Sequence, residues 1–369
     1  MKILFITTHI NIGGVTRYIY DISSRLVKNG TSCYVASSGG EFNDLFTKAG
    51  VSLIDCNMKT KFEFHPKLVF EVIKLTKFVK ENNIDIIHAH TRVSQIIACM
   101  VSKITGKVFV STCHGFFKHN KVFRKIFPCW GKKVIAISDA VKTHLIEDFK
   151  IKEEDVAVIY NGVDVQAYEH IIAEEQKNKM LKEFDFLSGP IVGTIGRLSP
   201  VKGYNYLLHA IKYIKKYIPE INMILIGDGP QKQYLMELAQ QLGISENVFF
   251  LGSRMDVKKI YPVMDVYVLP SLQEGLGLSL IEAMASEKAC VATNVGGISN
   301  IISNWEDGLL VDAADSLALA DTIRKLIGDS FTRMALGKRA RVKVKEKFDI
   351  KDTVINTLKF YEEVLNEKK

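Results

Sequence analysis

The chain has 369 residues, of which 47% are hydrophobic and 24% charged, and its formal net charge is +8. This length favours two domains, and this composition excludes a wholly disordered or low-complexity chain. No apolar stretch of about 18 residues lacks a charge, and no cleavable leader precedes the first apolar segment, so we expect a cytoplasmic protein without a transmembrane helix. The six cysteines form no CxxC pair, which predicts reduced thiols rather than a disulfide framework or a zinc site.

The first half of the chain alternates predicted strands and helices. Predicted strands cover residues 2–7, 33–36, 84–88, 108–112, 133–137 and 156–160, and predicted helices cover 16–28, 66–81 and 93–104 and begin again near 139. In the first helix, Ile19, Ile22 and Leu26 lie at helical spacing, and Gly30 follows as a helix-ending glycine. This alternation predicts a parallel sheet with helices on both faces.

The alternation stops at a charged stretch, residues 166–185, and then starts again. Further predicted strands cover 191–195, 223–226, 248–251, 266–270, 289–293 and 309–311, with helices at 204–217, 231–242 and 278–285. We therefore expect an α/β protein with two facing Rossmann-like, doubly wound parallel-sheet domains, residues 1–170 and 186–349, joined by a linker at 171–185. Ligands bind such sheets beyond the carboxyl ends of the strands, so the site is expected in the cleft between the domains.

Two glycines, Gly13 and Gly14, follow the first strand and open a helix. Glycines at such a place let the backbone approach a phosphate, and a helix N-terminus favours negative charge. The pair is not a full GxGxxG fingerprint, so a simple tight turn is the alternative interpretation.

Arg197 and Lys202 lie five residues apart in the glycine-containing loop that follows the first strand of the second half. A guanidinium and an ammonium on one loop can hold a pyrophosphate from two directions and stabilise a departing diphosphate. The alternative is a pair of solvated surface cations.

The segment from Pro270 to Ala285 contains two glutamates eight residues apart. Glu274 lies on a glycine loop that leaves a strand, and Glu282 lies on the helix that follows. The amides of Gly275, Leu276, Gly277 and Leu278, at the start of this helix, predict an anion site between the two carboxylates. Each carboxylate can accept hydrogen bonds from a sugar or ribose diol. A capping Glu274 and an exposed Glu282 would leave the loop glycines unexplained.

Histidines follow two of the predicted strands. His114 comes before Gly115 at the end of a strand, where it can donate a hydrogen bond or carry a proton, although a structural histidine is the simpler alternative. His88 and His90 alternate on a strand and could both bind a metal, but no third ligand and no DxD motif is apparent, so we predict no metal site.

A basic, aromatic run covers residues 116–133 within a segment, 86–138, that has no acidic residue. Such a run can dock on an anionic membrane, or it can be a solvated basic face over a local aromatic cluster. Nucleic acid is another polyanion that it could bind, but we do not predict it as a partner.

Together these motifs resemble family 4 of the glycosyltransferases, also called group 1, of the GT-B type. The resemblance covers nearly the whole chain. It rests on Gly13 and Gly14, His114 and Gly115, the Asn161–Asp164 run, Gly196 to Leu198, Lys202 and Gly203, and the spaced Glu274 and Glu282.

The resemblance implies retaining transfer of a hexose or N-acetylhexosamine from a nucleotide-diphosphate sugar, without a required metal or other cofactor. It implies that Arg197 and Lys202 hold the diphosphate, Glu274 the donor sugar and Glu282 the ribose. His114 would help position the sugar near the reacting carbon.

For the remaining site residues, the resemblance implies that Gly13 and Gly14 close over the diphosphate and that Arg254 lies beside the base. UDP is the expected nucleotide on family frequency alone. A C-terminal helix, about residues 350–369, is expected to pack on the first domain.

The expected acceptor is a lipid-linked or cell-envelope glycan of the capsule, lipopolysaccharide or exopolysaccharide type, which makes a bacterial enzyme at the inner face of the cell membrane the working hypothesis. A non-catalytic sugar-nucleotide or glycan-binding protein is the main alternative, because it would keep the fold and lose the chemistry. A dinucleotide-dependent oxidoreductase would need a fuller glycine fingerprint and an acidic residue for the ribose.

Overall fold

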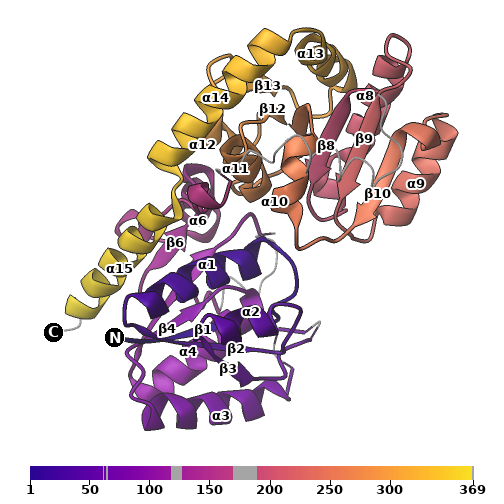
Figure 1. Cartoon of the computed structure of the whole chain (residues 1–369). Coiled ribbons are helices and arrows are strands. Elements are labelled where there is room, and N and C mark those ends of the chain that lie inside the picture. The colour runs from indigo at the N-terminus through magenta and orange to yellow at the C-terminus, as the bar shows by residue number, and fades with distance from the viewer. Residues whose placement is uncertain (61, 64, 118–126, 169–188, 368–369) are drawn as a thin grey trace. The chain divides into compact units, whose positions relative to one another are not determined.

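The computed structural model describes residues 1–60, 62–63, 65–117, 127–168 and 189–367. Its elements form two compact units, one of Met1–Asn161 with Ile350–Lys369 and one of Gly162–Asp349 (Figure 1). Each unit holds one sheet whose described strand pairs are all parallel. The predicted fold class of two Rossmann-like parallel-sheet domains is therefore confirmed.

The first unit contains a seven-stranded sheet of order β3-β2-β1-β4-β5-β6-β7. Its strands are β1 (Lys2–Ile6), β2 (Ser32–Ser37), β3 (Ser52–Asp55), β4 (Ile86–Ala89), β5 (Val108–Cys113), β6 (Val134–Ala136) and β7 (Val156–Val158). Its helices are α1 (Gly14–Lys28), α2 (Asn43–Lys48), α3 (Leu68–Glu81), α4 (Arg92–Thr105), α6 (Asp139–Phe149) and α15 (Ile350–Asn366).

The central strand β1 supplies both faces of this sheet with apolar side chains. Ile3 and Phe5 join a core that includes residues of α1 and α15. Leu4 and Ile6 point to the other face and join a core that includes residues of α3 and α4. Because successive strand side chains point to opposite faces, a continuous apolar run is what a sheet covered on both sides requires.

The second unit contains a six-stranded sheet of order β10-β9-β8-β11-β12-β13. Its strands are β8 (Ile191–Ile195), β9 (Asn222–Ile226), β10 (Val248–Gly252), β11 (Val266–Leu269), β12 (Ala289–Thr293) and β13 (Leu309–Val311). Its helices are α8 (Tyr204–Lys215), α9 (Lys232–Gln241), α10 (Val257–Ile260), α11 (Leu278–Ala285), α12 (Ile298–Ile301), α13 (Ser316–Gly328) and α14 (Ser330–Lys347).

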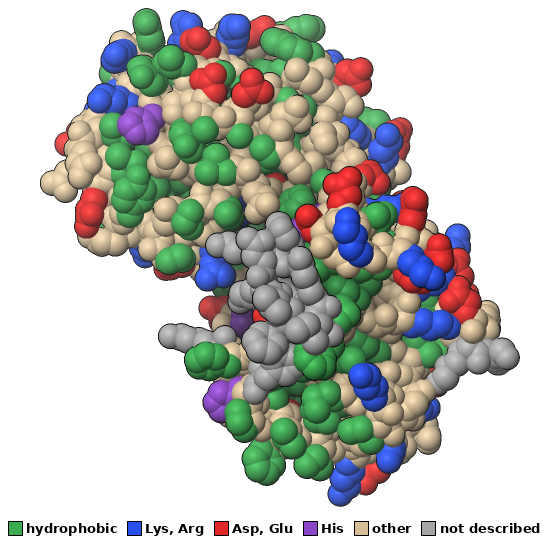
Figure 2. Space-filling model, turned by 180° about the vertical axis from the view of Figure 1, so that it is seen from behind, with side chains coloured by type: hydrophobic (Ala, Val, Ile, Leu, Met, Phe, Trp, Pro, Cys, Tyr) green, Lys and Arg blue, Asp and Glu red, His purple; other side chains and the backbone are tan. Residues whose placement is uncertain are grey.

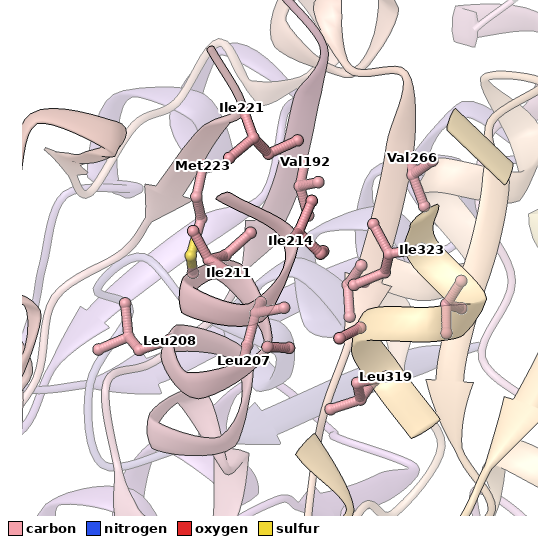
Figure 3. Close-up of a cluster of buried hydrophobic side chains, with 14 of the residues drawn as sticks. Val192, Leu207, Leu208, Ile211, Ile214, Ile221, Met223, Val266, Leu319 and Ile323 are labelled. Carbon is pink, nitrogen blue, oxygen red and sulfur yellow. The ribbon is translucent and has the colours of Figure 1, made fainter. Parts of the chain in front are cut away.

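One core of the second unit lies between this sheet and two helices. Leu207 and Ile211 of α8 and Leu319 of α13 meet Val192 of β8 and Val266 of β11 (Figure 3). All five side chains are fully buried. The neighbouring strands β8 and β11 are thereby held against one helical layer, which fixes where their carboxyl ends lie.

Several elements were not anticipated from the sequence, namely α2, β3, α10, α12, α13 and α14. In α14 the buried residues are Leu336, Gly337, Ala340 and Val344, so its apolar face is narrow and built partly of small residues. A Cβ on Gly337 would lie 2.1 Å from the Glu287 carbonyl oxygen, which explains why a glycine stands in this helix.

Two sequence predictions fall largely outside the described residues. The stretch 171–185, predicted as a linker, lies wholly outside them, and residues 118–126 of the basic aromatic run 116–133 do as well. Among the helices that the structure does describe, none has the length and apolarity needed to cross a membrane.

Candidate functional site

The sheet order of the second unit has its switch point between β8 and β11. From β8 the chain continues to β9 and β10 on one side, whereas β11 leads to β12 and β13 on the other. Doubly wound sheets bind ligands at such a point, outside the carboxyl ends of the strands. The loop after β8 carries Arg197 and Lys202, and the loop after β11 carries Glu274, so the topology brings together residues more than 70 positions apart.

These two loops are joined through their backbones. The Leu272 amide donates to the Val201 carbonyl oxygen at 2.8 Å. Gly203, just after Lys202, has φ +64°, and a Cβ there would lie 2.1 Å from the Pro270 carbonyl oxygen. Both the left-handed backbone and the close approach require glycine at this position. The Lys202 loop is therefore fixed against the Glu274 loop.

Lys202 and Glu274 form an ion pair across the junction. The Lys202 Nζ lies 2.5 Å from Glu274 Oε2, and the side chains are only 19% and 13% exposed. Ser271 Oγ donates to the same carboxylate oxygen at 3.1 Å. The sequence analysis assigned Lys202 to the diphosphate and Glu274 to the donor sugar of one ligand. It did not predict that the two side chains contact each other.

Tyr204 lies at the same junction, at the start of α8. Its side chain is fully buried, and its hydroxyl lies near the Thr194 side chain. Burial, and then the negative charge of Glu274, raise the pKa of the Tyr204 hydroxyl above its usual range. This hydroxyl therefore stays neutral, and the carboxylate and ammonium of the Lys202–Glu274 pair are the charged groups at the junction.

The loop after Glu274 leads into the N-terminus of α11. Gly277, with φ +101°, precedes the helix, which has no side-chain cap and no acidic residue in its first turn. The Gly297 amide donates to the Glu274 carbonyl oxygen at 3.0 Å, and a Cβ on Gly297 would lie 2.2 Å from the Gly275 carbonyl oxygen. The helix thus begins at a fixed loop with amides that side chains do not cap, which is the arrangement that binds anions.

Glu282 lies one helical turn beyond Leu278, on α11. Tyr261 Oη donates to Glu282 Oε2 at 2.8 Å and lies 3.1 Å from the Ser279 carbonyl oxygen. Burial raises the pKa of Tyr261 well above 10, and the charge of Glu282 adds to this effect, so the phenol remains a donor. The carboxylate is therefore held in one orientation by a buried tyrosine that the sequence analysis missed.

The two remaining predicted cations differ in their surroundings. Arg197 is exposed, and its guanidinium makes no hydrogen bond or ion pair with any residue that the structure describes. Arg254 instead binds Asp256 through two contacts, Nε to Oδ1 and Nη2 to Oδ2, both 2.8 Å long. An anion that enters this site can therefore pair with the Arg197 guanidinium, whereas the Arg254 guanidinium already binds Asp256.

In the first unit, the carboxyl ends of β1, β4 and β5 lie side by side. Gly13 and Gly14 follow β1, His90 follows β4 and His114 follows β5. A Cβ built on either glycine would meet nothing within 4 Å, so packing does not require glycine there. The open space above both glycines is compatible with the predicted approach of a ligand to the backbone.

Three histidines meet beneath this edge. His90 Nδ1 lies 3.1 Å from His114 Nε2, and His88 contacts Tyr361 Oη of α15 at 2.6 Å and Thr112 Oγ1 at 2.7 Å. Burial lowers the pKa values of His88 and His114 to about 3 and that of His90 well below 6.5, so all three rings are neutral at pH 7.

The contact between His90 and His114 was not foreseen, although its signal was present in the sequence. His88 and His90 alternate along one strand end, and the next strand of the sheet ends just before His114. Within the described part of the chain, no three His, Cys, Asp or Glu side chains are grouped so as to bind a metal ion.

The carboxyl edge of the second sheet thus carries groups that suit phosphates and groups that suit hydroxyls. An uncapped helix N-terminus, the Arg197 guanidinium and the Lys202 ammonium favour phosphate groups. Two fixed carboxylates, Glu274 and Glu282, stand at either end of the same loop and helix, where they can accept hydrogen bonds from hydroxyls. A ligand with a diphosphate between two polyhydroxylated groups matches this order of donors and acceptors.

Comparison with known families gives two matches that together span most of the chain. Residues 175–343 match the family model described as "Glycosyl transferases group 1". Residues 12–167 match the family model described as "Glycosyltransferase Family 4". The first match contains every predicted donor-binding residue of the second unit, and the second contains Gly13, Gly14 and His114.

Individual relatives agree with these families, and a solved structure shares the fold. The N-acetyl-alpha-D-glucosaminyl L-malate synthase of Bacillus anthracis is 26% identical, over 99% of this chain and 97% of that protein. The UDP-Gal:alpha-D-GlcNAc-diphosphoundecaprenol alpha-1,3-galactosyltransferase of Escherichia coli is 28% identical, over 76% of this chain and 75% of that protein. The crystal structure of Anabaena HepE in complex with UDP-glucose superposes with a TM-score of 0.88 at 24% identity, covering 98% of this chain and 100% of that one.

Proposed function

Because the chain belongs to the group 1 glycosyltransferases and is therefore a glycosyltransferase, we propose that it moves a hexose or N-acetylhexosamine from a UDP-sugar to a hydroxyl of a lipid-linked or cell-envelope glycan. One observation supports the part of this proposal that concerns the UDP-sugar donor. The Lys202–Glu274 pair lies at the switch point of the second sheet, beside the uncapped N-terminus of α11.

In the proposed complex the second unit binds the donor. Lys202, Arg197 and the amides of Gly275, Leu276, Gly277 and Leu278 hold the diphosphate, Glu274 accepts hydrogen bonds from the sugar, and Glu282 accepts them from the ribose. The cationic and amide donors stabilise charge as it develops on the departing UDP. These groups supply the neutralisation that a divalent cation supplies elsewhere, so we propose transfer without a required metal.

The first unit is proposed to serve the acceptor side and the reacting carbon. His114 is neutral at pH 7 and contacts His90 through Nε2, which leaves Nδ1 to position the sugar. A Cβ on Gly13 or Gly14 would meet nothing within 4 Å, which supports the proposal that these glycines approach the diphosphate. We further propose that the acceptor hydroxyl attacks from the face that the UDP leaves, so that the anomeric configuration is retained.

The acceptor class is supported by the relatives. The name of the Escherichia coli relative specifies a UDP-sugar and a diphosphoundecaprenol-linked acceptor. A Staphylococcus aureus relative, 30% identical over 62% of this chain and 60% of that protein, is a capsular polysaccharide biosynthesis glycosyltransferase. The first name specifies a lipid-linked acceptor and the second a capsular polysaccharide, and on that basis we propose an acceptor of this kind.

The test is a screen of UDP-, GDP- and ADP-sugars for release of the free nucleotide, with undecaprenyl-diphosphate-linked sugars as trial acceptors. We expect release from UDP-sugars that is faster with an acceptor and insensitive to EDTA, and NMR of the product should show the anomeric configuration of the donor. Release only from GDP- or ADP-sugars would overturn the UDP assignment, an inverted product would overturn retention, and loss of activity in EDTA would overturn metal independence.

A further inference from the structure

Helix α3 of the first unit has two apolar faces. Leu68, Val72, Leu75 and Val79 lie on the inner face and are buried in the core against the sheet. On the outer face, Val69, Phe70 and Ile73 are 51%, 74% and 62% exposed. A helix on the surface of a soluble protein ordinarily carries polar residues on its outer face, so core packing explains only the first of these two faces.

The exposed apolar surface continues beyond α3. Phe62 is 73% exposed and precedes Glu63, which binds Arg92 at the start of α4. Met100 and Ile104 of α4 are 42% and 56% exposed. Helices α3 and α4 pack beside each other, with their inner residues in the same core, so their outward faces lie in one layer. We name this layer the α3–α4 face and define it by Phe62, Val69, Phe70, Ile73, Met100 and Ile104.

In space-filling view, hydrophobic side chains gather at the end of the first unit where α3 and α4 lie, and Lys and Arg side chains border them (Figures 1 and 2). Contiguous apolar surface bordered by polar groups marks an interaction site more often than isolated exposed residues do.

The charges around the α3–α4 face are mainly positive. Exposed lysines occur on both helices, at Lys74, Lys77, Lys80 and Lys103. Of the acidic residues nearby, Asp55 is exposed, and its carbonyl oxygen accepts a hydrogen bond from Lys74 Nζ at 2.5 Å. The others are paired or partly buried. Glu63 binds Arg92 at 3.1 Å, Glu81 lies 3.8 Å from Lys77, and Glu71 is half-buried with Oε2 out of contact with solvent. No acidic residue occurs anywhere in residues 86–138, which include α4.

We propose that the α3–α4 face docks on an anionic lipid bilayer. Phe62, Phe70 and Ile73 would enter the interface between head groups and acyl chains, and the lysines would keep their ammonium groups at the anionic head groups. The sequence analysis placed membrane docking on residues 116–133, of which 118–126 lie outside the described residues. The α3–α4 face is a separate surface, made by two helices that share one core.

The pattern favours a bilayer over the other occupants of an apolar, basic surface. A second copy docked through the same face would bring two sets of lysines together, and like charges across an interface are costly. Nucleic acid would match the lysines but not the exposed aliphatic and aromatic side chains at the centre. The proposal deepens the proposed function, because a lipid-linked acceptor is presented at a membrane surface, but its test does not depend on transferase activity.

The test is flotation of the full-length protein with two kinds of vesicle, phosphatidylcholine alone and phosphatidylcholine with phosphatidylglycerol. We expect the protein to float with the anionic vesicles only, and to be released when salt is raised from about 0.1 M to about 1 M, which shortens the Debye length from about 10 Å to about 3 Å. The double variant Phe70→Ser/Ile73→Ser should bind about tenfold more weakly or worse, and Lys74→Glu/Lys77→Glu should show the same loss.

The matched control is Phe331→Ser on α14 of the second unit, where the side chain is 80% exposed. This variant should float as well as the parent. The proposal would be overturned if the parent ignored anionic vesicles at low salt, or if Phe70→Ser/Ile73→Ser floated as the parent does. A dimer in solution that this double variant converts to a monomer, without any flotation, would assign the face to a second copy instead.

The same preparations separate this proposal from the proposed function. UDP should protect the parent and the Phe70→Ser/Ile73→Ser variant equally against thermal unfolding, because the substitutions lie in the other unit. Flotation without UDP protection would leave the docking face standing and remove the donor assignment. UDP protection without flotation would leave the donor assignment standing and remove the docking face.

Discussion

At the scale of single residues, the Lys202 ammonium is the group on which the donor site depends most. It is held 2.5 Å from Glu274 and lies on a loop that Gly203 and the Val201 carbonyl oxygen fix against the neighbouring loop. We expect Lys202→Ala to lower kcat/KM for nucleotide release by about 10²-fold or more, the usual loss for a group that stabilises developing charge. Steady-state release of UDP is the measurement.

Two further variants separate charge stabilisation from structural support. Lys202→Arg keeps a cation and should recover part of the rate. Lys232→Ala removes a partly exposed lysine of α9 whose contact with Asp228 is 3.5 Å long, and it should behave as the parent. Equal rates for Lys202→Ala and Lys232→Ala would show that Lys202 does not act on the donor.

Glu282 allows a test of binding that leaves the fold intact. When its carboxylate is removed, the Tyr261 hydroxyl still has the Ser279 carbonyl oxygen within 3.1 Å, so this buried hydroxyl keeps an acceptor. We expect Glu282→Ala to raise KM for the UDP-sugar by about 10- to 100-fold, because hydrogen bonds to a charged group contribute about 1.5–3 kcal/mol, with little change in melting temperature. An unchanged KM would remove the ribose assignment.

The buried histidines predict a pH dependence of the first unit. The folded-state pKa values of His88 and His114 are about 3, below the value of 6.5 expected in the unfolded chain. Between these two values the unfolded state binds more protons than the folded state. The free energy of unfolding is therefore not reduced above pH 6.5, and it decreases as the pH falls from 6.5 towards 3. Each histidine should contribute a slope of about 1.4 kcal/mol per pH unit in this window.

The two tryptophans make this prediction measurable. Trp130 is 8% exposed and lies in the first unit, whereas Trp305 is 62% exposed and lies in the second. Urea unfolding of a Trp305→Phe variant, followed by Trp130 fluorescence, should show a free energy of unfolding that already falls between pH 6.5 and 5. A constant value over that range would contradict the burial of neutral histidines.

At the scale of elements, helix α15 belongs to the first unit although it is the last element of the chain. Its Ile350, Val354, Phe360, Tyr361 and Val364 are buried in the core that contains Ile3 and Phe5. Burial of one such side chain contributes about 1.5–3 kcal/mol, so the helix supplies stabilisation comparable with the total stability of a typical domain.

The Tyr361 hydroxyl tests how α15 is fixed. Tyr361→Phe removes the 2.6 Å contact with His88 Nδ1 and leaves a buried polar atom without that partner, which costs about 1–3 kcal/mol. Trp130 fluorescence in the Trp305→Phe background should report this loss. The control Tyr234→Phe, at a side chain 48% exposed, should lie within about 0.5 kcal/mol of the parent, and an equally small effect of Tyr361→Phe would contradict the role given to this contact.

At the scale of the whole molecule, periodicity was sufficient to predict two parallel-sheet units. Helix α11 and the strands β8, β12 and β13 have the predicted bounds, because each is a compact apolar run ended by polar or glycine residues. Helices α13 and α14 were not predicted. In α14 the buried side is small and interrupted by Gly337, so the apolar period is weak.

The site was predicted only in part for a different reason. Motifs identified Lys202, Glu274, Glu282 and His114 one by one, but their partners come from other strands. The Lys202–Glu274 pair spans 72 positions and the His88–Tyr361 contact spans 273, and only the order of strands in each sheet and the docking of α15 bring these residues together. Likewise, the exposed outer face of α3 becomes apparent only when its inner face is seen to be buried.

The central claim is that the loop and helix end around Lys202 and Glu274 bind the diphosphate of a UDP-sugar. Calorimetric titration of the full-length protein with UDP, GDP, ADP and NAD(H) tests it most directly. We predict saturable binding of UDP alone, weakened about tenfold or more in Lys202→Ala and unchanged in Lys232→Ala. Binding of NAD(H) without UDP, or UDP binding that Lys202→Ala leaves intact, would contradict the account.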